Sequence, residues 1–175
     1  MPFRRGRRPI RGTRKRAIWV NIPFGAVAFT ESVGNQLLLT AEDWEAQFAG
    51  AANETAVLRA VVGQLTWSQT VVGTAGGNAF WGIYIADKDS TVPPTFSTAG
   101  MGDYDWLRVG SRITSSSVTA TLVQTLREGT EDIHIKAKRR LKSRDAVYIA
   151  AQFGSDAASP AGVLGGILRF LVARD

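Results

Sequence analysis

Apolar and polar residues alternate along much of this chain, and a period of two predicts β-strands. The alternation is clearest in the stretches 118–126 and 133–138. In the second stretch one side would carry Ile133, Ile135 and Ala137, and the other His134, Lys136 and Lys138. Strands of this kind bury one face and expose the other, because successive side chains point to opposite sides of a sheet.

The pattern predicts eight main strands. They are expected at 17–30, 55–72, 80–86, 104–109, 118–126, 133–138, 146–153 and 163–173. The first is expected to break at Pro23, since proline cannot donate to a strand ladder. Turns are expected at 31–35 and 127–130, and the run 36–39 is apolar.

The longest predicted strand, 55–72, should present Val57, Val61, Leu65 and Trp67 on one face, with Gly63 marking a bulge. A glycine-rich loop at 73–78 follows it and precedes the strand 80–86. Two strands separated by such a loop predict a β-hairpin.

One short helix is predicted at 41–48. Thr40 is a suitable N-cap, and Asp43 places a carboxylate in the first turn, where it favours a helix start. Trp44 and Phe48 are four residues apart, so they would share one face of this helix.

Strands without helical crossovers predict an antiparallel all-β domain, either a sandwich or a barrel. The expected domain, 17–175, is of ordinary single-domain size, and 45% hydrophobic residues across the chain suffice for one core. The absence of cysteine excludes disulfides and thiolate metal sites. No apolar run reaches the ~20 residues that span a bilayer, so no membrane partner is expected. Because no apolar segment follows the first residues, a secretory signal is not expected either.

Charge changes this picture, because residues 1–16, here called the basic arm, hold eight cations and no carboxylate. They are Arg4, Arg5, Arg7, Arg8, Arg11, Arg14, Lys15 and Arg16. The arm has too few apolar residues for a core of its own. Its arginines favour phosphate, which a guanidinium can contact with two hydrogen bonds.

The charge of the chain is segregated. Of 21 basic and 15 acidic residues, removing the arm leaves 13 basic and 15 acidic, a net charge of −2. A cationic segment on a slightly acidic body is typical of proteins that bind polyanions, and nucleic acid is the expected partner. A nuclear-localisation segment or a solubilising tail are the alternatives.

A second cationic cluster lies between 136 and 144. It consists of Lys136, Lys138, Arg139, Arg140, Lys142 and Arg144. The cluster is either a solvated turn or a second phosphate-binding patch that acts with the arm. On the second interpretation Lys136, Lys138, Arg139 and Arg140 join the arm as nucleic-acid-binding residues.

Catalytic and metal chemistry find little support. His134 is the sole histidine, so a zinc site or a catalytic triad would depend on it alone. The loop Gly73–Gly77 lacks the GK[ST] ending of a phosphate-binding loop. The pairs Asp87/Asp89 and Asp103/Asp105 are solvated turn residues rather than a calcium site. No enzyme activity, metal or cofactor is expected.

The five tryptophans have two interpretations. They could stack on the bases of single-stranded nucleic acid, or they could fill the core and subunit interfaces. They lie in five different elements, which favours packing. Trp44, Phe48 and the segment Tyr104-Asp-Trp106 are candidates for interface anchors, although the core would suit the tryptophans equally.

The layout resembles the capsid proteins of small circular single-stranded DNA viruses, of the circovirus-like and environmental types. The resemblance covers nearly the whole chain as a pattern, although the body is shorter than a typical circovirus capsid protein. It is carried by the RRGRR and RGTRKR runs of the arm, Ala17–Asn21, Tyr104–Trp106, Lys138–Lys142 with Ala146–Tyr148, and Ile167–Val172.

The resemblance implies a single eight-stranded antiparallel jelly roll, a sandwich of two sheets, with Ile18–Thr30 beside Val163–Ala173. It also implies self-assembly into an icosahedral shell of 60 copies or a multiple, with the arms inside on single-stranded DNA. Sixty arms would bring about 480 positive charges, enough for several hundred nucleotides. The protein would then reside in the virion, and in the host nucleus during assembly. The alternative function is a β-barrel nucleic-acid-binding protein that forms no shell, similar to a ribosomal or phage-encoded protein.

Overall fold

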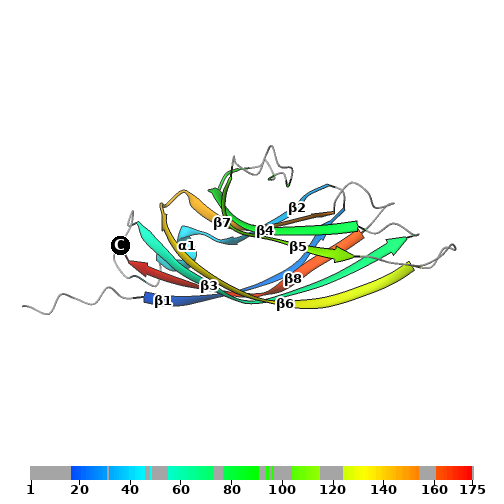
Figure 1. Cartoon of the computed structure of the whole chain (residues 1–175). Helices are drawn as coiled ribbons and strands as arrows, with labels where there is room; N and C mark the ends of the chain where they lie inside the picture. Colours follow the sequence, from blue (N-terminus) through cyan, green and yellow to red (C-terminus); the bar gives the residue numbers. More distant parts are fainter. Residues whose placement is uncertain are drawn as a thin grey trace, which may run out of the picture.

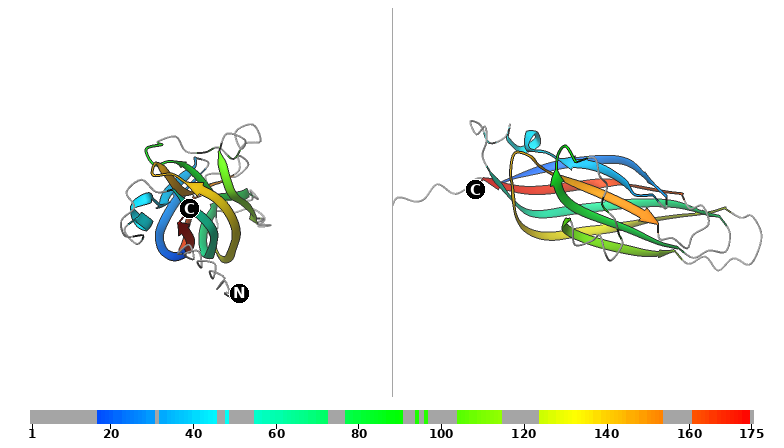
Figure 2. Two further views of the ribbon diagram at one scale, coloured as in Figure 1. Left: turned by 90° about the vertical axis from the view of Figure 1, so that its left-hand side faces the viewer. Right: turned by 90° about the horizontal axis from the view of Figure 1, so that it is seen from above.

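The computed structural model describes residues 17–30, 32–45, 48, 55–72, 77–90, 94, 96, 104–114, 124–153 and 161–174. These residues form two four-stranded antiparallel sheets that pack face to face (Figure 1). Seen end-on, the sheets are the two layers of a sandwich (Figure 2). The elements are β1 (Ala17–Phe29), β2 (Gly34–Leu39), α1 (Ala41–Glu45), β3 (Ala56–Val72), β4 (Gly77–Asp87), β5 (Asp105–Thr114), β6 (Gln124–Leu141), β7 (Asp145–Phe153) and β8 (Ala161–Arg174).

The strand order is that of a jelly roll. One sheet has the order β1-β8-β3-β6 and the other β2-β7-β4-β5. The first and last strands pair antiparallel from Ala17 opposite Ala173 to Phe29 opposite Gly162. This confirms the predicted fold class and the predicted neighbourhood of the chain's first and last strands.

The main core lies between the two sheets. Its least exposed side chains alternate along the strands with exposed ones, as the period of two requires. Leu58, Val61, Ile83, Ile149 and Leu168 are each 0% exposed. Burial of this apolar surface is the principal force that holds the sheets together.

A second, smaller core covers the outer face of the β2-β7-β4-β5 sheet. Tyr84 stacks on Tyr148 with ring centroids 5.3 Å apart, and Trp106 packs against Tyr84 at the same distance. Phe96, from the β4–β5 connection, lies 5.2 Å from Trp106. Strand β7 is therefore buried on both faces, which explains why its sequence is apolar throughout.

The prediction for β1 is wrong at one point, and β2 was not predicted as a strand. β1 continues through Pro23 instead of breaking there, because β1 is an edge strand and needs only one partner. Its register shifts only later, between Phe24 and Val27. The apolar run at 36–39 belongs to β2, a strand missing from the predicted eight.

Two predicted connections are wrong. β3 and β4 do not form a hairpin, since they belong to different sheets. The expected turn at 127–130 lies inside β6, which runs from Gln124 to Leu141. The predicted strands 118–126 and 133–138 therefore reduce to one long strand, and residues 118–123 lie outside the described ones.

Strand β3 changes its buried face at a different residue from the predicted one. Its register shifts between Leu58 and Ala60 against both neighbours, so Leu58 and Val61 are buried while Val57 is not. Gly63 lies in regular pairing and is not a bulge. It allows β3 and β8 to approach closely instead, because an added Cβ would clash with the carbonyl oxygen of Ile167.

The predicted helix is present but shorter. Thr40 precedes its first residue, at the expected N-cap position, and the Asp43 carboxylate accepts a hydrogen bond from the backbone N–H of Thr40 at 2.7 Å. The rings of Trp44 and Phe48 are 6.4 Å apart, and both side chains are buried in the main core.

Candidate nucleic-acid interface

The eight cations of the basic arm lie outside the described residues, and the described chain begins directly after them at Ala17. In register, Ala17 lies opposite Ala173, Ala173 opposite Val57, and Val57 opposite Arg140. The arm therefore joins the β1-β8-β3-β6 sheet in the row of residues that contains Arg140.

Five cations share the outer face of this sheet, and we call this surface the basic face. They are Arg59, Lys136, Lys138, Arg140 and Arg169. The buried residues of β6 and β8 face the core, so the residues between them point outward. On this face the carboxylate of Asp132 accepts a hydrogen bond from the side chain of Gln64 at 3.3 Å. The face is strongly basic although the body of the chain is slightly acidic.

The irregularity in β3 groups three of these cations. Because Leu58 and Val61 both point inward, the residues between them, including Arg59, are displaced to the outside. Arg59 lines a hollow with Lys136 and Lys138, over the backbone of β3 and β6. Three exposed cations therefore surround one hollow, and this concentration of positive charge suits a polyanion.

The predicted cationic cluster is divided by the fold. Lys136, Lys138 and Arg140 lie on the basic face, whereas Arg139 does not. Arg139 lies opposite the inward residue Leu58, and its guanidinium reaches Asp105 of the other sheet at 3.1 Å. That ion pair joins β5 to β6 across the open edge of the sandwich.

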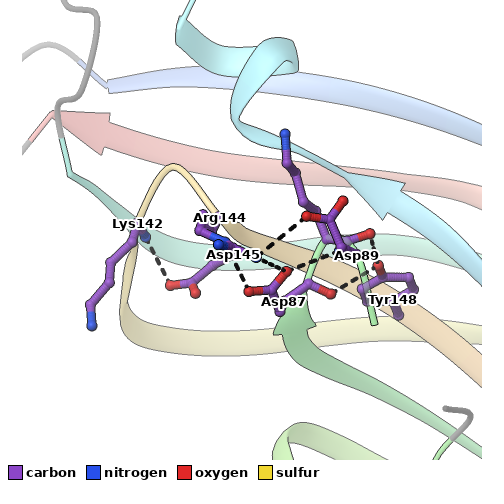
Figure 3. Close-up of polar contacts among 7 residues, drawn as sticks. Asp87, Asp89, Lys142, Arg144, Asp145 and Tyr148 are labelled. Carbon is purple, nitrogen blue, oxygen red and sulfur yellow. Dashed lines mark hydrogen bonds and ion pairs between the residues drawn. The ribbon is translucent and has the colours of Figure 1, made fainter. Parts of the chain in front are cut away.

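Arg144 also points away from the basic face, toward the end of β4 (Figure 3). Its guanidinium contacts the carboxylates of Asp87 at 3.1 Å and Asp89 at 3.4 Å. The hydroxyl of Tyr148 donates to the carbonyl oxygen of Lys88 at 2.9 Å. The contacts connect the β6–β7 turn to the β4 strand end.

The two ionisable groups at this connection have shifted pKa values. The backbone N–H of Asp89, and then Arg144, lower the pKa of the Asp87 carboxyl. Burial, and then the charge of Asp87, raise the pKa of the Tyr148 hydroxyl. The carboxylates of Asp87 and Asp89 thus both contact the guanidinium of Arg144. No cluster of three potential metal ligands occurs in the described part of the chain.

The structure separates the five tryptophans. Trp44 and Trp81 are 1% and 5% exposed, so they belong to the core, and Trp44 is not an interface anchor. Trp67 is half-buried, and Trp106 is half-buried within the smaller aromatic core. Only Trp19 is largely exposed among them, at 41%, and it lies on the basic face.

Sequence reasoning missed Arg59 and Arg169. Arg169 alternates with the buried residues Leu168 and Phe170, so the alternation could have placed it on an exposed face. What the sequence could not supply is the pairing of β8 with β3, and of β3 with β6, that brings these arginines beside the lysines of β6. His134 lies on the same face, exposed and opposite Val62, as its predicted polar position required.

No helix in the described ranges is both long and apolar enough to span a bilayer.

No protein-family model and no curated protein matches this sequence. Solved structures with a similar arrangement include that of tobacco necrosis virus, which is 12% identical with a TM-score of 0.38 over 94% of this chain and 87% of that one. The structure of Desmodium yellow mottle tymovirus is 11% identical, with a TM-score of 0.34 over 98% and 94% of the two chains. That of the TNF protein Eiger from S. frugiperda is 12% identical, with a TM-score of 0.29 over 87% and 93%.

Proposed function

We propose that the chain is a viral coat protein, which assembles with copies of itself into an icosahedral shell and packages the genome through its basic arm. The observation that carries the proposal is the segregation of charge on a jelly roll. Eight cations precede a body of net charge −2, and the body still gathers five cations on the sheet that the arm enters. This arrangement suits a protein that presents one side to a polyanion and the others to neighbouring subunits.

The fold supports the proposal through its strand order. The capsid resemblance in the sequence implied that the first and last strands are neighbours in one sheet, and β1 and β8 are. The finer proposal follows that resemblance: a small circular single-stranded DNA genome, a shell of 60 copies or a multiple, and residence in the virion, with passage through the host nucleus. Binding through phosphate contacts would make packaging largely independent of sequence.

The test is to replace the eight cations of the arm by glutamine, which keeps its length, and to compare this variant with a deletion of residues 1–16. Both variants should form a folded β body by circular dichroism, and both should package much less nucleic acid than the full chain. The ratio of absorbance at 260 and 280 nm of purified particles measures the loss. Unchanged packaging by either variant would show that the arm is not the packaging element.

A β protein that binds nucleic acid without forming a shell is the second candidate, and the basic face favours it as much as the first. Size-exclusion chromatography separates the two. A coat protein elutes as a particle in the megadalton range, whereas the second candidate elutes as a monomer or small oligomer.

A further inference from the structure

One aromatic ring lies among the cations of the basic face. Trp19 is 41% exposed on the edge strand β1, and its neighbour Val20 points into the core. In register it lies opposite Leu171, which lies opposite Ala60, which lies opposite Lys136. Trp19 and Lys136 thus occupy one row across four strands, about 14 Å apart at the usual strand spacing.

The ring of Trp19 is coupled to one of the cations. The guanidinium carbon of Arg169 lies 5.1 Å from the centroid of the ring, within the range of a cation–π contact. The Nε–H of Arg169 donates to the side-chain oxygen of Asn21 at 3.0 Å, which orients the guanidinium. An aromatic ring and a guanidinium are therefore held side by side.

We propose that Trp19 stacks on a base of single-stranded nucleic acid whose phosphates contact Arg169 and the cations around the β3–β6 hollow. The inference rests on the proposed function, and it assigns the body of the chain a binding site besides the arm. Base stacking on an aromatic platform beside a basic groove is a general way to bind single strands without selecting sequence.

The charges and the aromatic ring together favour this occupant over others. Five cations on one face suit a polyanion, whereas a protein partner for an exposed tryptophan needs mainly an apolar surface. A duplex keeps its bases stacked on one another, so it has phosphates for the cations but no free base for the ring. Trp44 and Trp81 are buried, so they offer no alternative platform.

The experiment measures the affinity of the full chain, freed of nucleic acid, for two probes of equal length. One is a short oligothymidylate and the other is an abasic oligonucleotide, which keeps the phosphates and lacks the bases. The wild-type chain should bind the oligothymidylate about tenfold more tightly. Trp19→Ala should abolish this preference and leave the affinity for the abasic probe unchanged, and Trp19→Phe should retain most of it.

Leu37→Ala is the matched control, because Leu37 is similarly exposed, at 43%, on β2 of the other sheet. It should leave the preference intact. The inference is overturned if the wild-type chain shows no preference, or if Trp19→Ala weakens binding of both probes equally. It is also overturned if Trp19→Ala changes only the sedimentation of the protein, since the ring then contacts another subunit. Failure of the wild-type chain to bind either probe would refute the proposed function as well.

Discussion

The division of the cationic cluster gives a sharp prediction, because two double variants remove equal charge from one short stretch. Lys136→Ala with Lys138→Ala takes two cations from the basic face. Arg139→Ala with Arg144→Ala takes two cations that pair with carboxylates elsewhere. The fold therefore gives the two variants different expected effects on nucleic-acid binding.

The size of the difference follows from counterion release. Each phosphate contact on a single strand contributes about 0.7 to the slope of log affinity against log salt concentration. Loss of two contacts should lower the slope by about 1.4 for the lysine variant. When the salt concentration rises from 50 to 200 mM, the fold-loss of affinity should therefore be about seven times smaller for the lysine variant than for the wild-type chain. The arginine variant should keep the wild-type slope.

Fluorescence anisotropy of a labelled oligothymidylate, titrated at several salt concentrations, measures both slopes. Sedimentation velocity should first establish that the two variants and the wild-type protein have the same size. Equal slopes for the two variants would refute the reasoning, because all the cations of residues 136–144 would then contribute equally to binding. An unchanged slope in the lysine variant would remove these lysines from the interface.

Three further predictions concern the fold. Gly63→Ala should destabilise the protein by about 3 kcal/mol or more in urea denaturation, because the φ of 156° at Gly63 and the nearby strand β8 exclude a side chain. Gly25→Ala should change the stability by less than about 1 kcal/mol, because nothing lies within 4 Å of an added Cβ there, and equal effects of the two variants would contradict the close approach at Gly63. Trp44→Ala should cost about 3–5 kcal/mol and lower the melting temperature, and a folded variant that only fails to assemble would contradict its place in the core. The backbone N–H of Asp89, and then Arg144, lower the pKa of Asp87, so its contribution to stability is present above the ordinary carboxyl pKa and is lost as the pH falls below about 4. Asp87→Asn should therefore melt below the wild type at pH 7 and approach it at acid pH, and a difference that is constant with pH would contradict the lowered pKa.

Local patterns in the sequence were sufficient to predict the strands that have one buried and one exposed face. Ile133, Ile135 and Ala137 are buried as predicted, and the helix cap at Thr40 forms with Asp43 as predicted. These features depend on neighbours a few residues away, so the periodicity and spacing of residues in the sequence are enough to predict them.

Long-range pairing could not be predicted in the same way. The sequence 127–130, Arg-Glu-Gly-Thr, has the composition of a turn, yet β3 pairs with every residue of it and keeps it extended. The loop after β3 has the composition of a hairpin, but the chain crosses there to the other sheet. Pro23 is tolerated because β1 is an edge strand, and the position of β1 at the edge depends on the strand order of the whole sheet.

The candidate site shows the same limit. Lys136 and Lys138 were found from their alternation, and the structure places both on the basic face. Arg139 follows them in sequence, but the unbroken alternation of β6 turns it inward with Ala137 and Leu141, and its guanidinium reaches Asp105. Arg59 and Arg169 come from strands far away in the chain, so no local pattern could assign them to the same surface.

Sedimentation velocity of the full-length protein with nucleic acid at moderate salt tests the central proposal most directly. A coat protein should sediment as a discrete particle in the megadalton range that absorbs as nucleoprotein, and the particles should appear closed in negative-stain micrographs. A species that sediments only as a monomer or small oligomer under these conditions would contradict the coat-protein proposal.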